Sequence, residues 1–141
     1  MQSQKEIQKG ELLAQVREKI LSTTIKEITP FGVKLELNLA GQVAGAMYSA
    51  QHIETVSIFQ KSDGTSETEA RAIETTKEGD VLVFSYRGTR KATGLTTVWA
   101  ESEALVMTQS PRLAQLNNTR IRAEVTGDFA TGEVNVKYYK L

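Results

Sequence analysis

The sequence predicts an all-β fold: a small antiparallel barrel of about seven or eight strands with one N-terminal α-helix. Apolar and polar residues alternate along most of the chain after residue 30, as they do in half-buried strands. Turn sequences that contain glycine, "KSDG", "KEGD", "KATG" and "GDFATG", separate these segments at fairly even spacing. A length of 141 residues predicts one domain, 1–141, with the helix over 1–24 and the barrel over 30–141.

The helix is predicted from a stripe of apolar residues near the start of the chain. Leu12, Leu13, Val16 and Ile20 fall on one side of a helix, with charged residues elsewhere. A free helix of this length would be marginal in water. We therefore expect it to dock on the barrel or on a neighbouring subunit.

The strands follow from period-two alternation. In "GVKLELNLAG" the apolar residues Val33, Leu35 and Leu37 alternate with polar ones, and Pro30 marks the break before this strand. The segment "SPRLAQLNN", 110–118, interrupts the pattern and is typical of a short helical turn or loop. Hairpins between evenly spaced strands favour a meander closed into a barrel. The predicted strands are 33–43, 46–60, 65–76, 81–91, 96–108, 119–126 and 133–140.

The lengths of the hairpin loops decide which side chains share a face of the sheet. A turn at 93–94 would place Tyr86 opposite Glu101, and a four-residue turn at 77–80 would place Arg71 beside Tyr86. A loop of odd length would turn the face over. With these loops, one face is aromatic and ionisable, and the other is small and aliphatic, with Glu74 and Arg87 as its charges. The first face holds His52, Glu54, Glu67, Glu69, Arg71, Phe84, Tyr86, Arg90, Trp99, Glu101 and Glu103.

Two arrangements of these faces stay open. In one, the aliphatic face is the core, because charged groups are rarely buried unpaired, and the exposed rings form a subunit interface or a seat for the helix. In the other, the aromatic face lines the lumen and its rings form a pocket. The second arrangement makes Glu101 and Glu103 candidate catalytic residues, because carboxylates beside rings are desolvated. Its candidate ligand-binding residues are Trp99, Tyr86, Phe84, Arg71, His52 and Glu54.

The composition argues against several classes of protein. Seventeen basic and seventeen acidic residues cancel, so nucleic acid and membrane surfaces are not expected partners. The first residues lack the apolar core of a signal peptide, which predicts a cytoplasmic protein. Cysteine is absent and His52 is the only histidine, so we predict no metal site and no cofactor, although Glu54 lies two residues away on the same face.

The strand series and the segment "MTQSPRLAQLNNTRIRAEVTGDFATGEV" resemble small bacterial proteins related to the allene oxide cyclase barrel, an eight-stranded fold of the lipocalin-like class. The resemblance covers about residues 30–141. It implies a cavity for a small apolar ligand, often within an oligomer. Some relatives are cyclases, but none of their catalytic residues is matched in this sequence.

Three functional hypotheses follow. The barrel binds a small hydrophobic or amphipathic molecule; or it is a cyclase, isomerase or proton-transfer enzyme that uses a cavity glutamate; or it is a structural, self-assembling module with an aromatic interface. A homo-oligomer is expected in each case, because apolar residues serve both faces of the sheet and a closed barrel has only one inside.

Overall fold

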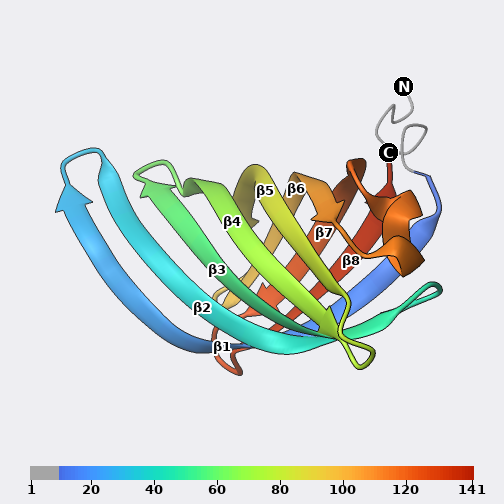
Figure 1. Cartoon of the computed structure of the whole chain (residues 1–141). Coiled ribbons are helices and arrows are strands. Elements are labelled where there is room, and N and C mark those ends of the chain that lie inside the picture. Colours follow the sequence, from blue (N-terminus) through green and yellow to red (C-terminus); the bar gives the residue numbers. More distant parts are fainter. Residues whose placement is uncertain (1–9) are drawn as a thin grey trace.

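The computed structural model describes residues 10–141 as eight antiparallel strands that close into one barrel (Figure 1). Each strand pairs with the next in the sequence, and β1 pairs with β8 to close the ring. The predicted all-β barrel is therefore confirmed. The elements are β1 (Leu12–Thr29), β2 (Gly32–Gly45), β3 (Ser49–Lys61), β4 (Thr65–Thr76), β5 (Val81–Ala92), β6 (Thr97–Thr108), the 3₁₀ helix η1 (Pro111–Leu116), β7 (Thr119–Asp128) and β8 (Glu133–Lys140).

The predicted N-terminal helix is wrong over residues 10–24, where the chain forms β1; residues 1–9 of that prediction lie outside the described part of the chain. Leu12, Val16 and Ile20 are four residues apart, a spacing that places side chains together on a helix and also on one face of a strand. Both neighbours in the ring, β2 and β8, supply the pairing that favours a strand here. The short helical turn expected within 110–118 is confirmed as η1.

The hairpins β3–β4, β4–β5 and β5–β6 turn over half of the predicted face. The structure pairs Gln60 with Ser66, Thr75 with Val81, and Ala92 with Val98. Each pair encloses five residues, so the side-chain facing changes by one position at each hairpin relative to the loops assumed from the sequence. Two successive changes cancel. The residues of β3 and β5 that were predicted to share a face therefore do so. In β4 and β6 the residues that face the lumen are the ones predicted to lie on the other face.

The interior has an aromatic half and an aliphatic half. Phe84, Tyr86 and Tyr138 are buried together, with Phe84 stacked on both tyrosines. Leu113 and Leu116 of η1 belong to the same buried cluster. Helix η1 thus covers one end of the barrel, and Figure 1 shows it beside the C-terminal end of β8. A second, smaller cluster forms the aliphatic half and contains Leu37, Leu39 and Ile58. Within residues 10–141, no helix has the length and apolar character needed to cross a bilayer.

Asp80 ties the β4–β5 turn to η1. Its carboxylate accepts hydrogen bonds from Ser110, Arg112 and Thr76, and these hold its pKa down at about 2. Arg112 also contacts Glu78. Because the pKa of Asp80 is lower in the folded state, its ionised carboxylate stabilises the fold at pH values above the ordinary aspartate pKa. This stabilisation is lost as the pH falls through the folded-state pKa.

We therefore expect Asp80→Asn to lower the melting temperature by several degrees at pH 7, and the difference from wild type to shrink as pH falls from about 4 to about 2. Thermal melts of both proteins across this range measure it. A deficit of the same size at pH 7 and pH 2 would contradict the linkage.

Candidate functional site

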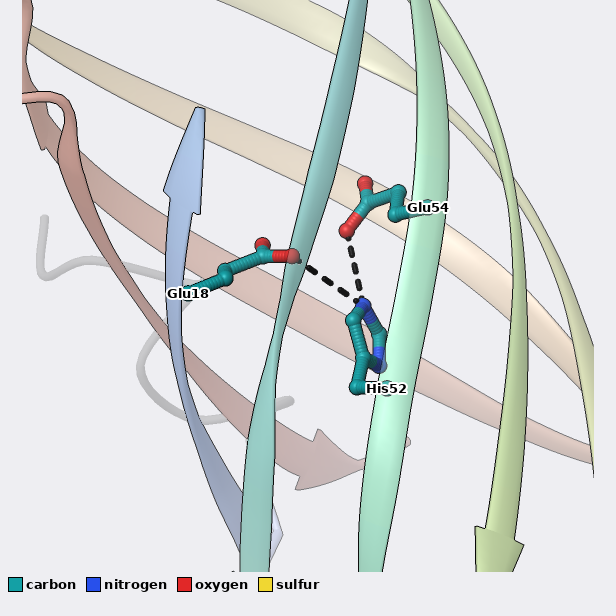
Figure 2. A group of neighbouring side chains, drawn as sticks. All are labelled: Glu18, His52 and Glu54. Carbon is teal, nitrogen blue, oxygen red and sulfur yellow. Dashed lines mark hydrogen bonds and ion pairs between the residues drawn. The ribbon is translucent and has the colours of Figure 1, made fainter. Parts of the chain in front are cut away.

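Four residues in one register row, Glu18, Gly41, His52 and Glu74, bring ionisable side chains together inside the barrel. The row runs across β1, β2, β3 and β4, with Glu18 paired to Gly41, Gly41 to His52, and His52 to Glu74. Because Gly41 has no side chain, the carboxylate of Glu18 meets the imidazole of His52 across β2. Figure 2 shows Glu18 and Glu54 both directed at the same ring nitrogen of His52.

Both nitrogens of His52 face carboxylates. Nδ1 lies 2.7 Å from Oε2 of Glu74. Nε2 lies 2.9 Å from Oε1 of Glu54 and 3.3 Å from Oε1 of Glu18. The single N–H at Nε2 can be directed well at only one of these oxygens, and the geometry favours Glu54. Oε1 of Glu18 is consequently buried without a hydrogen-bond partner.

Glu74 is fully buried and is held by three groups. Besides facing His52, it accepts hydrogen bonds from Tyr48 Oη at 2.5 Å and Tyr138 Oη at 3.2 Å. The Tyr138 hydroxyl also hydrogen-bonds that of Tyr86. Burial and the Glu74 carboxylate raise the pKa of Tyr48, so its proton remains available to donate. Glu74 is thus an anchored acceptor that orients His52.

Burial and neighbouring charges shift the pKa values of Glu18 and His52. Burial raises the pKa of Glu18 to about 8. Burial alone would lower the pKa of His52, but the carboxylates of Glu18, Glu54 and Glu74 outweigh it and raise that pKa to about 11. In this largely buried group, carboxyl groups outnumber positively charged side chains.

An interior cavity of about 90 Å³ adjoins this group. Glu18, Glu54 and Tyr86 line it in the middle of the barrel, and it reaches Arg90 and Phe129 near the β7–β8 hairpin. The guanidinium of Arg90 lies over the ring of Phe129, 5.1 Å from its centroid. Most of the remaining wall is aliphatic, including Ile20, Leu39, Ile58, Ala100, Val125 and Val136.

The structure divides the eight predicted site residues into two groups. His52, Glu54, Phe84 and Tyr86 lie in the barrel interior, as the second arrangement of the faces predicted. The expectation that Arg71, Trp99, Glu101 and Glu103 share this pocket is wrong, because the loops turn β4 and β6 over and place Ala70, Ala72, Ala100 and Ser102 inside.

On the outer surface the two candidate glutamates have cross-strand arginine partners. Glu101 contacts Arg122, and Glu103 contacts the more exposed Arg120. Opposite charges across neighbouring strands stabilise a sheet modestly. The two glutamates thus lie on the outward side of an amphipathic strand, β6.

Sequence reasoning missed Glu18, Tyr48 and Tyr138, and did not assign Glu74 to the site. Glu18 was placed on a helix, although it continues the alternation of Ala14 and Val16, which identifies it as inward-facing once β1 is a strand. Glu74 was noted as a charge on an otherwise aliphatic face, and that isolation was the available signal.

Comparisons with known proteins support the fold. Neither a protein-family model nor a curated protein matches the chain. A conserved protein of unknown function from Rhodopseudomonas palustris is similar in structure, with a TM-score of 0.80, 14% identity and coverage of 92% of this chain and 95% of that one. A protein of unknown function from Clostridium acetobutylicum has a TM-score of 0.81 and 15% identity, with coverage of 93% of this chain and 97% of that one.

A β-barrel-like protein from Acinetobacter baumannii has a TM-score of 0.79 and 15% identity, with coverage of 92% of this chain and 93% of that one. An enzyme from Penicillium herquei is less similar in structure, with a TM-score of 0.64 and 18% identity over 92% of each chain. At these identities the likeness concerns the fold alone: a small β-barrel. The resemblance to the allene oxide cyclase group is not confirmed.

Proposed function

We propose that the barrel binds a small, mainly apolar molecule in its interior cavity. The observation that supports this most directly is an aliphatic cavity within a closed barrel that ends at Glu18 and Glu54. Ligand sites are typically apolar walls with a few convergent polar groups. The volume, about 90 Å³, is below the ~150 Å³ of a cavity that holds benzene, so it fits a compact group of only a few heavy atoms.

The two ends of the cavity favour an amphipathic ligand. Arg90 supplies a cation near one end, and partial burial desolvates its guanidinium and lowers its pKa. A carboxylate or carbonyl on the ligand would compensate that desolvation. A molecule longer than the cavity would extend past Arg90 and Phe129 towards solvent.

Methyl NMR tests the binding proposal. Short-chain alcohols and carboxylic acids are titrated into protein with labelled Ile, Leu and Val methyls, and signals of Ile20, Leu39 and Ile58 should shift. We expect Ala100→Leu, which fills the cavity, to weaken binding at least tenfold, equivalent to about 1.4 kcal/mol. Thr89→Leu, on the outer face of β5, is the matched control. Shifts confined to surface methyls, or equal binding by Ala100→Leu, would contradict the proposal.

If the protein is an enzyme, Glu54, which lines the cavity, is the candidate catalytic residue in place of Glu101 and Glu103. Its carboxylate faces the cavity and is oriented by a hydrogen bond to His52. A proton-transfer catalyst should exchange the α-hydrogens of a small ketone such as acetone in D₂O, and Glu54→Gln should abolish that exchange. No acceleration by the wild-type protein leaves ligand binding as the proposed function.

We also propose that the chain self-associates through an apolar row on its outer surface. Ile53, Ile73, Val83 and Met107 are successive register partners across β3, β4, β5 and β6, and three of them are strongly exposed. A nearby row alternates in charge, with Glu69, Arg87, Glu103 and Arg122. Alternating charges can pair with themselves across a twofold axis, which favours a second copy of this chain as the partner.

Light scattering at micromolar concentration should therefore give a mass above that of one chain, 15.6 kDa. Ile73→Asp should return it to the single-chain mass, because it buries a charge in the interface. Asn135→Lys on β8, away from the row, should leave the oligomer intact. A wild-type mass of 15.6 kDa would count against self-association.

A further inference from the structure

We propose that Glu18, His52 and Glu54 form a binding site for a first-row divalent cation, with Zn²⁺ as the best match. His52 Nε2 and one oxygen from each carboxylate lie within 4.8 Å of one another. Imidazole nitrogen and carboxylate oxygen are both ordinary zinc ligands. The three residues come from β1 and β3, two strands of the barrel wall, and Figure 2 shows their side chains converging.

The other nitrogen of His52 has the partner that a metal-bound histidine requires. Nδ1 lies 2.7 Å from Glu74 Oε2, so Nδ1 carries a proton and donates it to the carboxylate. A cation that binds at Nε2 displaces the proton that Nε2 directs at Glu54 in the empty site, and the Nδ1 hydrogen bond to Glu74 is kept. Carboxylate–histidine–metal arrangements of this kind orient the ring and strengthen the ligand. Tyr48 and Tyr138 in turn hold Glu74 in place.

The unpartnered oxygen of Glu18 is the independent sign of a missing ligand. Glu18 is 5% exposed, and its Oε1 has no hydrogen-bond partner although it points at Nε2 from 3.3 Å. Ligand atoms about 2.0–2.1 Å from a tetrahedral zinc stand roughly 3.3 Å apart. The separation of Nε2 from Glu18 already has this value, and that from Glu54, 2.9 Å, needs only a small opening.

The carboxyl groups around His52 favour a divalent cation. Three carboxylates, of Glu18, Glu54 and Glu74, surround one imidazole. A divalent cation at Nε2 supplies two positive charges to these carboxyl groups, and buried charges are stable only when compensated. The expectation of no metal site rested on the absence of cysteine and on a single histidine, and the predicted helix kept Glu18 apart from His52.

Three protein ligands leave a coordination position open. Glu18 and Glu54 also line the interior cavity, so that position faces it. An open position is typical of catalytic rather than structural zinc sites, and water or an oxygen of a bound molecule would fill it. The cation site does not depend on the proposal that the cavity binds an apolar ligand, because its donors are all protein atoms.

Calorimetry on chelator-treated, tag-free protein tests the site with Zn²⁺ alone. We expect one equivalent to bind with a Kd on the order of micromolar or tighter. Co²⁺ should give visible d–d bands of a low-symmetry site. His52→Gln and Glu18→Gln should each weaken Zn²⁺ binding at least tenfold, whereas Glu103→Gln, an exposed glutamate on the outer face, should leave it unchanged.

A second measurement locates the ion without mutation, in case the buried variants fail to fold. Mn²⁺ should broaden the methyl signals of Leu39, whose register partner is Glu54, and leave those of the fully exposed Leu95 sharp. Broadening at Leu95 but not Leu39 would overturn the proposal. So would the absence of binding to folded wild type, or unchanged affinity in folded His52→Gln and Glu18→Gln.

Discussion

Gly41→Ala should destabilise the protein by at least ~3 kcal/mol and lower its melting temperature by roughly 10 °C. A Cβ at residue 41 would lie 1.9 Å from the carbonyl oxygen of Arg17 and 2.5 Å from Cα of Glu18. Both atoms belong to the backbone of β1, so no side-chain rotation relieves the overlap. The two strands must separate, and this is where the β1–β2 ladder brings Glu18 towards His52.

Gly127→Ala is the matched control, since it also adds a methyl group to a strand glycine. The nearest atoms to its new Cβ are side-chain methyls of Val98 and Val134, at 3.3 and 3.4 Å, which can move aside. Its melting temperature should stay within a few degrees of wild type. Equal stability of both variants would show that close approach at Gly41 does not matter. The same row gives a second readout, because displacement of Glu18 should change the NMR signals of the His52 ring.

Much of the fold follows from local sequence signals. Period-two alternation in β2 and the glycine turns specify strands and hairpins before any tertiary contact is known. The start of the chain was misassigned because Leu12, Val16 and Ile20 suit both periods, and only pairing with β2 and β8 decides between them. That pairing is long-range, and residues 12–20 do not encode it on their own.

The candidate site was only partly predictable, for a reason that lies in the loops. In three successive hairpins the number of residues between the paired positions is odd, whereas the sequence argument assumed an even number. An odd number reverses which side chains of the next strand face the lumen. His52 and Glu54 on β3 kept their relation to Tyr86 on β5 because two errors cancel. Glu101 on β6 is separated from β3 by a third hairpin and therefore lies outside.

The row Glu18–Gly41–His52–Glu74 becomes visible only when the registers are known. No two of its members are closer than eleven residues in the sequence, so no spacing motif joins them. Their shared feature is local and weak: each is a polar residue or glycine at an inward position of an otherwise apolar face. Such interruptions of an apolar alternation are the sequence signal to look for in barrels of this kind.

Glu74→Ala should cost about 4 kcal/mol or more of unfolding free energy, enough to unfold a marginally stable domain. The carboxylate is fully buried and accepts from Tyr48, Tyr138 and His52. Its removal leaves Tyr48 and Nδ1 of His52 without an acceptor, each costing ~1–3 kcal/mol, leaves Tyr138 with Tyr86 alone, and opens a cavity beside the rings. It also removes one of the carboxylates that compensate positive charge at His52.

Urea unfolding measures the loss, and the same strand supplies the control. Glu69 is on β4 with its side chain 61% exposed, and its contact with Arg87 is long, 3.4 Å. Glu69→Ala should therefore change the unfolding free energy by less than ~0.5 kcal/mol. Glu74→Gln should fall between the two, because an amide keeps the shape and one acceptor but loses the charge that His52 faces. Unfolding free energies of Glu74→Ala and Glu69→Ala within ~1 kcal/mol of each other would show that the buried carboxylate does not hold the barrel interior together.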